Sequence, residues 1–378
     1  MKSANLRLAY AMCVNPNQAP AVTHTQQRYP YIDLLRGLAA LLVVACHVLA
    51  FREWPNFVPT GFGKLAQMGW VGVDLFLVIS GFVIGKTAMQ ASSTGKPWRA
   101  HFVERRLRRI VPLYLATLVL YLLLVDPAPI LKGWRSVIDV AMHLGFIHNL
   151  SPSTHGTINS PNWSLGLEMQ FYLLIAILAP WLARADVWKV LAAWVGIAVL
   201  WKFALTLVLI PGANVTHHQF IYASQLPGTL DEFAFGICIA KLTSLTALEF
   251  RWRRLVAWSV AAVVLLAGAW ITIGHGGDFW QSTTMIVFWR TLLAAGFAAL
   301  LAVTVMLPGT GGWALRPFRY LGEISYGIYL WHLPVLLTLI DKTSFKGWTL
   351  MFATVGCTIV LAALSWHGFE KLWMKRIA

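Results

Sequence analysis

Ionisable side chains inside long apolar runs are the residues of this chain whose types and spacing suit chemistry. Arg36 and His47 lie eleven positions apart in the run 31–50, so a helix would separate them by about 16 Å. A cation and an imidazole cost free energy in hydrocarbon, and such side chains face a bundle interior or a wet cavity. The pair therefore predicts a polar site that joins two levels of a membrane.

Two carboxylates occupy similar positions in other apolar runs. Asp74 lies in the run 67–86 and Glu168 near the start of the run 164–183. A carboxylate and an imidazole at similar depth can act as a base and its orienting partner. We therefore interpret His47, Glu168 and Asp74 as candidate catalytic residues. The alternative for Asp74 is that it only orients a neighbouring His or Arg.

Four arginines lie within five residues of a basic segment: Arg105, Arg106, Arg108 and Arg109. One interpretation is a topology anchor that reaches lipid phosphate. The other is a binding site for a phosphate-rich cosubstrate, because guanidinium groups bind phosphate oxygens in pairs. Arg36 is expected at the same membrane level.

Composition identifies the class of protein. The chain has 378 residues, of which 58% are hydrophobic and 12% charged, and its mean hydropathy is +0.65. Soluble domains carry about 25% charged residues, so this is an integral membrane protein. The net charge of +15 does not indicate nucleic-acid binding, because the cations lie at the ends of apolar runs. Neither the four cysteines nor the histidines have the spacing of a metal site, so no metal is expected.

The predicted fold class is all-α, a polytopic integral membrane helical bundle. The ten expected spans are near 31–50, 67–86, 109–125, 164–183, 188–210, 228–245, 255–273, 285–307, 322–340 and 347–367. The segment 136–150 is apolar on one face but short, and we interpret it as interfacial or re-entrant. With both termini in the cytoplasm, 22 of the 30 Lys and Arg residues fall on the inner side and 6 on the outer side, as the positive-inside rule requires.

The domain prediction follows from these spans. Residues 1–30 form a polar cytoplasmic tail, residues 31–370 the transmembrane domain, and residues 371–378 a short basic cytoplasmic tail. No segment between the spans is long enough for a soluble catalytic domain, so the chemistry is expected within the bundle or at its edge.

Five motifs resemble the membrane-bound acyltransferase-3 family. The family includes O-acetyltransferases of lipopolysaccharide O-antigen, exopolysaccharide and nodulation factors. The motifs are the Arg36-x10-His47 pair, Gly72-Val-Asp-Leu-Phe-Leu-Val-Ile-Ser-Gly-Phe82, Arg105-Arg-Leu-Arg-Arg-Ile-Val-Pro112, Trp163-Ser-Leu-Gly-Leu-Glu168 with Phe171-Tyr172, and Ile324-Ser-Tyr-Gly-Ile-Tyr-Leu-Trp-His-Leu-Pro334. Each motif alone is weak, but their order along ten spans is specific.

The resemblance implies transfer of an acyl group, usually acetyl, from cytoplasmic acyl-CoA to a hydroxyl of a saccharide or glycolipid acceptor at or beyond the outer side of a bacterial inner membrane. It implies that His47 and Arg36 are essential and that the arginines of segment 105–109 bind the CoA phosphates. We interpret five residues as acceptor-binding: Trp163, Ser164, Tyr326, Tyr329 and His332. Some relatives carry a C-terminal SGNH-type hydrolase domain. None is expected in this chain, so a separate extracytoplasmic transferase is an alternative receiver of the acyl group.

Several alternatives stay open at this stage. Polar residues inside ten spans also suit a transporter that makes no covalent product. Two further alternatives remain. The protein could hand acyl groups to a separate transferase, or it could be a regulatory membrane protein that senses acyl groups without turnover. His47 can act as a general base or form a covalent acyl intermediate. His332 can be a structural hydrogen-bonding residue.

Overall fold

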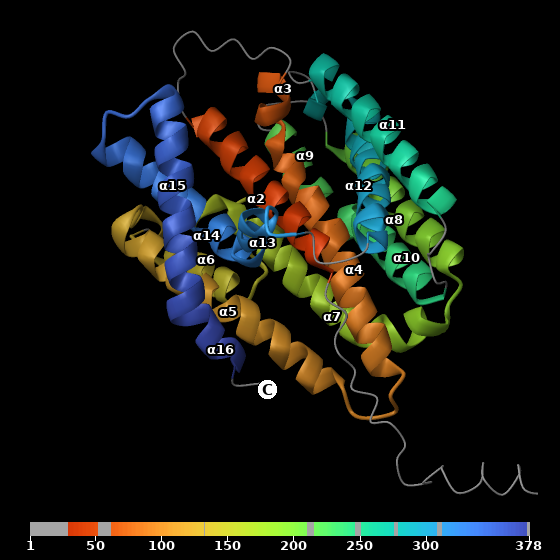
Figure 1. Cartoon of the computed structure of the whole chain (residues 1–378). Coiled ribbons are helices and arrows are strands. Elements are labelled where there is room, and N and C mark those ends of the chain that lie inside the picture. The colour runs from red at the N-terminus through yellow and green to blue at the C-terminus, as the bar shows by residue number, and fades with distance from the viewer. Residues whose placement is uncertain are drawn as a thin grey trace, which may run out of the picture.

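The structure is a computed structural model that describes residues 29–51, 62–131, 133–209, 215–245, 251–275, 279–307 and 312–375 (Figure 1). Across these ranges every regular element is helical. Residues 1–28 of the predicted tail 1–30 lie outside the described residues. The same holds for residues 376–378 of the predicted tail 371–378. The longer helices are α2 (Pro30–Phe51), α4 (Gly72–Ser92), α5 (Arg99–Leu124), α6 (Trp134–Leu144), α7 (Trp163–Arg184), α8 (Val187–Val208), α9 (Val215–Ala223), α10 (Leu226–Leu245), α11 (Arg251–His275), α12 (Arg290–Met306), α13 (Arg316–Glu323), α14 (Ser325–Lys342) and α15 (Gly347–Ser365).

Short helices join these elements. They are α3 (Phe62–Gln67), α16 (Lys371–Lys375), five 3₁₀ turns at Gly69–Val71, Ala128–Ile130, His148–Leu150, Ser160–Asn162 and Phe279–Gln281, and two π-helical turns at Met285–Trp289 and Trp366–Glu370.

Eight helical segments in the described part of the chain are long and apolar enough to cross a membrane. They correspond to eight of the ten predicted spans. The predicted span 322–340 differs, because α13 and α14 meet at an angle of 72° and together would make a ninth span. The remaining prediction, 228–245, corresponds to α10, which has 20 residues but carries Asp231, Glu232 and Lys241 and is therefore less apolar.

Helix α6 covers the first part of the segment 136–150, which the sequence analysis interprets as interfacial or re-entrant. Its 11 residues rise about 16 Å, roughly half the thickness of a hydrocarbon core. Its apolar side chains Trp134 and Val137 are exposed, whereas its polar side chains Asp139 and His143 are buried. This reversed amphipathic pattern suits a helix that lies against lipid and turns its polar face to the protein.

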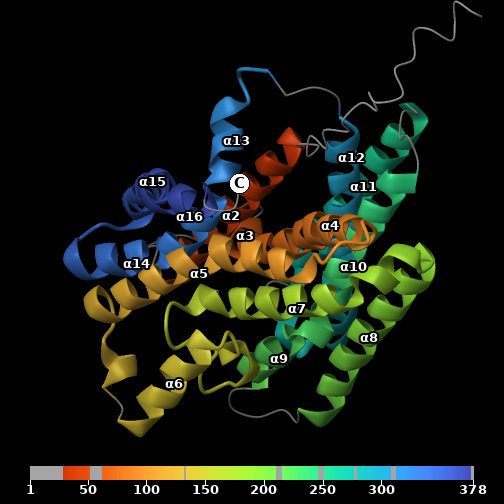
Figure 2. The same ribbon diagram turned by 90° about the horizontal axis from the view of Figure 1, so that it is seen from below.

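Helix α2 lies in the middle of the bundle. It contacts α4, α12, α13, α14 and α15, and these helices surround it in Figure 1. Figure 2 shows α5 and α7 side by side, with α14 next to α5 and α13 turned away from α14. The helices that enclose the polar site are thus drawn from both ends of the sequence.

Helices α4 and α10 touch backbone to backbone. A Cβ atom at Gly81 would collide with the carbonyl group of Phe233, and one at Gly236 would collide with the carbonyl oxygen of Val78. Small residues allow this approach, which is typical of packed membrane helices. The two glycines therefore form a seam along which α4 and α10 have no side-chain spacer.

Buried ion pairs join the same helices. Arg290 of α12 donates from Nε to Oδ1 of Asp74 of α4 over 2.9 Å, and its Nη2 lies 3.0 Å from Oε1 of Glu232 of α10. Lys202 of α8 lies 2.8 Å from Oδ2 of Asp231. All five side chains are at most 2% exposed. Since a lone charge is costly in an apolar bundle, each ion depends on its partners on other helices.

We predict that Arg290→Leu destabilises the bundle strongly. The substitution leaves the Asp74 and Glu232 carboxylates buried without their cation, which costs about 3–5 kcal/mol. The measurement is the thermal or denaturant unfolding midpoint of the purified protein in detergent. The double variant Arg290→Leu/Asp74→Leu should regain part of the loss.

The matched control is Arg108→Leu, because the Arg108–Glu104 pair is 31% and 50% exposed. An exposed pair contributes less than about 1 kcal/mol. Equal losses in Arg290→Leu and Arg108→Leu would contradict a stabilising role for the buried network.

A histidine-rich segment follows α6. His148 is fully buried and stacks on His143 with ring centroids 4.0 Å apart, while His155 is 3% exposed and stacks on Trp163. Burial lowers the pKa of His148 to about 3, and the adjacent His143 adds to this effect. Burial likewise lowers the pKa of His155 to about 3, with His217 contributing. Both rings are therefore neutral at physiological pH.

We predict that acid destabilises this segment. Unfolded histidine has a pKa near 6.5, so between about pH 6.5 and 3 the unfolded chain binds more protons than the folded chain. The stability is fully present above pH 6.5 and falls as the pH drops, by about 2 kcal/mol per histidine at pH 5. Thermal unfolding at pH 7 and pH 5 measures this loss.

His148→Phe keeps a stacked ring that cannot titrate, so its loss between pH 7 and pH 5 should be smaller than that of the wild type. His101, which is exposed, offers the control His101→Phe. If His148→Phe and the wild type lose the same stability on acidification, the buried histidine is not the cause.

Candidate active site

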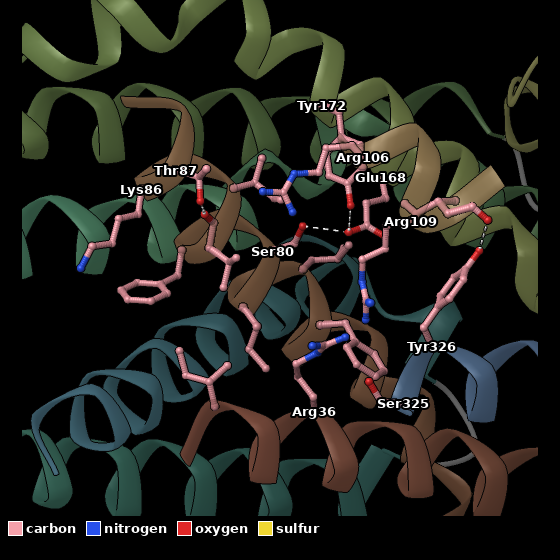
Figure 3. Close-up of a pocket in the computed structure, with 18 of the residues that line it drawn as sticks. Arg36, Ser80, Lys86, Thr87, Arg106, Arg109, Glu168, Tyr172, Ser325 and Tyr326 are labelled. Carbon is pink, nitrogen blue, oxygen red and sulfur yellow. Dashed lines mark hydrogen bonds between the residues drawn. The ribbon is translucent and has the colours of Figure 1, made fainter. Parts of the chain in front are cut away.

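A cavity of about 1040 Å³ is lined by α2, α4, α5, α7, α13 and α14 (Figure 3). Helix α4 contributes its longest wall. From Val73 to Ala91 this wall covers about 27 Å at 1.5 Å per residue. The lining residues of α4 are Val73, Phe76, Leu77, Ile79, Ser80, Phe82, Val83, Ile84, Lys86, Thr87, Gln90 and Ala91. The cavity can therefore hold an extended molecule along the bundle.

Cations from three helices line this cavity. Arg36 of α2 and Arg109 of α5 point toward one another, and Arg106 lies on the adjoining wall (Figure 3). Lys86 of α4 lines the cavity nearer the end of that helix. Three carboxylates are also present, and Asp33 lies 4.0 Å from Arg36. Two guanidinium groups that approach each other repel, so an anion between them would stabilise this arrangement.

The predicted arginine group divides into two pairs. Arg106 and Arg109, three positions apart, face the cavity. Arg105 is exposed and does not line it. Arg108 also lies off the cavity and donates from Nη2 to Glu104 over 2.6 Å. The prediction that all four arginines bind one cosubstrate is therefore supported by geometry for only two of them.

Glu168 lies at the centre of the cavity wall. Ser80 donates to its Oε1 over 3.0 Å, and Tyr172 donates to the same oxygen over 2.6 Å. Figure 3 shows this carboxylate beside Arg106 and Arg109. Glu168 thus shares a cavity with the arginines, and its contacts are hydroxyl groups and not the imidazole that the sequence analysis expected.

Ser164, Tyr326 and Tyr329 line the same cavity. The Ser164 and Tyr329 hydroxyl oxygens are 2.7 Å apart, and the Tyr329 hydroxyl donates to the Pro161 carbonyl over 2.8 Å. The Tyr326 hydroxyl donates to the Ile110 carbonyl over 2.7 Å. Phe76 packs edge-on against Tyr329. These contacts order the part of the cavity wall that lies near the start of α4.

His47 and His332 form a pair beside Tyr329. Nε2 of His332 lies 3.3 Å from Nδ1 of His47, and the ring centroids are 4.9 Å apart. His332 is fully buried and His47 partly exposed. Neither lines the cavity, but the ring of Tyr329, which does, lies 5.8 Å from that of His332.

The structure corrects the expected partner of His47. Asp74 belongs to the buried network with Arg290 and Glu232, and it does not line the cavity. Asp74 therefore fulfils the structural alternative, in which it binds a neighbouring arginine. Its side chain leaves the cavity face of α4 because it lies one position after Val73, about 100° further round the helix.

Trp163 lies apart from the cavity, although it precedes Ser164. It is 8% exposed, and its ring stacks on His155 and meets Phe220 edge-on. It belongs to an aromatic cluster that continues through Trp280 to Trp70.

Three functional candidates were missed in the sequence. Ser80 and Tyr172 hold Glu168, and Lys86 extends the row of cations. The signal for Ser80 was its helical spacing from Val73 and Thr87, which places it on the same face. The ion pairs of Arg290 were not predicted either, because a sequence does not show which helix carries its partner.

Metal ligands do not gather in the described ranges. Among them, no group of three or more His, Cys, Asp or Glu side chains is arranged to hold a metal ion.

The chain is similar to known proteins over most of its length. The acyltransferase domain of the acyltransferase-3 family matches residues 29–367. BcsY of Komagataeibacter xylinus, which is assigned as a membrane-bound transacylase, is 30% identical over 88% of this chain and 79% of its own length. The peptidoglycan O-acetyltransferase OatA of Listeria monocytogenes is 28% identical over 92% of this chain and 56% of its own. Nodulation protein 10 of Rhizobium leguminosarum bv. viciae is 26% identical over 94% and 96%.

The chain thus spans about half the length of OatA and most of the other two relatives. No solved structure matches it. The family match covers every helix that lines the cavity, and it favours an enzyme over the transporter alternative. The chain therefore belongs to the acyltransferase-3 family and is a multi-pass membrane acyltransferase.

Proposed function

We propose that this enzyme transfers an acetyl group from cytoplasmic acetyl-CoA to a hydroxyl of a saccharide-type acceptor at or beyond the outer side of a bacterial inner membrane. One observation carries the proposal: a single cavity is lined by Arg36, Arg106 and Arg109 and also by Tyr329, whose ring lies beside the His47–His332 pair. The relatives named as O-acetyltransferases support an acetyl donor and an oxygen acceptor.

The donor would lie along the wall of α4. Its phosphates would contact the guanidinium groups, because arginine binds phosphate oxygens through charge-assisted hydrogen bonds. Nε of Arg106 is buried and has no hydrogen-bond partner among the described residues, which is unusual unless a ligand supplies one. The thioester end would then point toward Ser164 and Tyr329.

The contacts of His47 define which of its nitrogens is basic. Nδ1 lies 2.9 Å from the carbonyl oxygen of Val43. A carbonyl oxygen only accepts hydrogen bonds, so Nδ1 carries the hydrogen and Nε2 carries the lone pair. The imidazole can therefore accept a proton at Nε2 without changing its contact with the helix.

The proposed step is a direct acyl transfer. Nε2 of His47 takes the proton of the acceptor hydroxyl while the hydroxyl oxygen attacks the thioester carbon. The C–S bond breaks, the CoA thiolate leaves, and the proton on Nε2 finally neutralises that thiolate. Because Tyr329 lines the cavity and contacts His332, it marks the point that the acetyl group must pass.

Glu168 is the competing base within the cavity. Its Oε1 already accepts hydrogen bonds from Ser80 and Tyr172, which leaves it less available to an acceptor hydroxyl. We therefore assign it to holding these hydroxyls and to balancing the charge of Arg106 and Arg109.

We predict that Arg106→Ala and Arg109→Ala each weaken acetyl-CoA binding about 10- to 100-fold. Each loses a hydrogen bond to a charged group, worth about 1.5–3 kcal/mol. Calorimetric titration of the purified protein measures this affinity. Arg108→Ala, on the same helix but off the cavity, should bind as the wild type does. Equal weakening in all three variants would contradict a phosphate site inside the cavity.

We predict that His47→Ala lowers transfer about 10²- to 10⁴-fold, the usual contribution of a general base. Proteoliposomes with labelled acetyl-CoA, followed by measurement of label in carbohydrate, provide the assay. Acetyl-CoA affinity should not change, because His47 lies outside the cavity. Glu168→Gln should retain more activity than His47→Ala. The reverse order, or near-normal labelling by His47→Ala, would reject His47 as the base.

A further inference from the structure

His332, the second histidine of the pair, contacts both the backbone of α14 and the ring of His47. His332 is fully buried and lies outside the donor cavity, so it does not reach the donor. Its Nδ1 lies 2.6 Å from the carbonyl oxygen of Tyr329, and its Nε2 lies 3.3 Å from Nδ1 of His47. The ring therefore stands between the backbone of α14 and the catalytic imidazole of α2.

The hydrogen positions follow from these neighbours. Because the Tyr329 carbonyl oxygen can only accept, Nδ1 of His332 carries the hydrogen and Nε2 carries a lone pair. Nδ1 of His47 carries a hydrogen for the same reason. The N–H of His47 thus faces two acceptors, the Val43 carbonyl and Nε2 of His332.

We propose that His332 is a positioning residue, which accepts a hydrogen bond from Nδ1 of His47 and thereby holds the catalytic ring and stabilises it once protonated. The inference rests on the proposed function, because it requires His47 to be the base. His332 itself neither touches the acceptor nor takes part in bond making.

The strength of this contact changes during the reaction. When Nε2 of His47 accepts the proton, its Nδ1–H becomes a charge-assisted donor, which binds about twice as strongly as a neutral one. Burial strengthens the contact further, because little water competes for it. Two charged rings with nitrogens 3.3 Å apart would repel, so the pair holds one added proton at a time.

The surroundings hold His332 in place. Asn159 donates from its side chain to the Leu330 carbonyl over 3.1 Å, and the Tyr329 hydroxyl donates to the Pro161 carbonyl. The segment before α7 is therefore fastened to the turn of α14 that carries the ring. A rigid acceptor costs little reorganisation when charge develops on His47.

The first test is independent of activity. Nitrogen NMR of protein labelled in histidine, with His332→Gln used to assign the signals, reports which nitrogen of each ring carries hydrogen. We expect hydrogen on Nδ1 of both rings and perturbation of the His47 Nδ1 signal in His332→Gln. Hydrogen on Nε2 of His332 would overturn the proposal, even if His47 proved essential.

The second test compares two variants of matched size. His332→Phe keeps the ring volume and removes the acceptor, whereas His332→Gln places an amide oxygen near the former Nε2. We expect kcat to fall about 10- to 100-fold in His332→Phe, the value of one hydrogen bond to a charged group. KM for acetyl-CoA should stay within about twofold, and His332→Gln should restore most of kcat.

The outcomes separate the two proposals. Normal kcat in His332→Phe, or equal losses in the Phe and Gln variants, would overturn the role of His332 as acceptor. Full activity of His47→Ala would instead reject the proposed function. If His332→Phe does not fold, the NMR assignment and the kcat of His332→Gln decide the question.

Discussion

The pairing of buried charges is the constraint on which the rest of this bundle depends. Arg290 serves Asp74 and Glu232 at once, so α4, α10 and α12 must keep one relative position. Water cannot replace a lost partner inside an apolar bundle. The position of the α4 wall that lines the donor cavity therefore depends on a charge, Asp74, on another face of the same helix. The same buried contacts therefore stabilise the bundle and set the position of the cavity wall.

Much of the fold could be predicted from the sequence, because the apolar runs are long and separated by charged segments. The bend between α13 and α14 could not, since no proline marks the break at Ile324 and the contact of Gly322 with the Asp33 carbonyl arises only from tertiary packing. The predicted segment 228–245 is helical, as α10, but with Asp231, Glu232 and Lys241 it is not among the helices apolar enough to cross a membrane.

The candidate site was predicted only in part. The residue numbers place Arg36 and Glu168 within apolar runs, whereas the packing and rotation of the helices decide what each side chain faces. Spacing along α5 could have separated Arg106 and Arg109 from their neighbours, because residues three apart share a face. No such pattern shows that His47 meets His332, since the two lie on different helices and their contact arises only from tertiary packing.

The glycine seam between α4 and α10 also determines how the site can change shape. Gly81 and Gly236 leave no side chain that could rotate aside, so these two helices move as one body. The wall of the cavity that α4 provides is therefore stiff. Helix α2 is held against α4 in the same way, because a Cβ atom at Gly72 would collide with the carbonyl oxygen of Ala39. Entry of a bulky donor and exit of its product must then depend on displacement of α5 and α14, which also line the cavity. The cavity therefore has one rigid wall, formed by α4, and another wall that can be displaced.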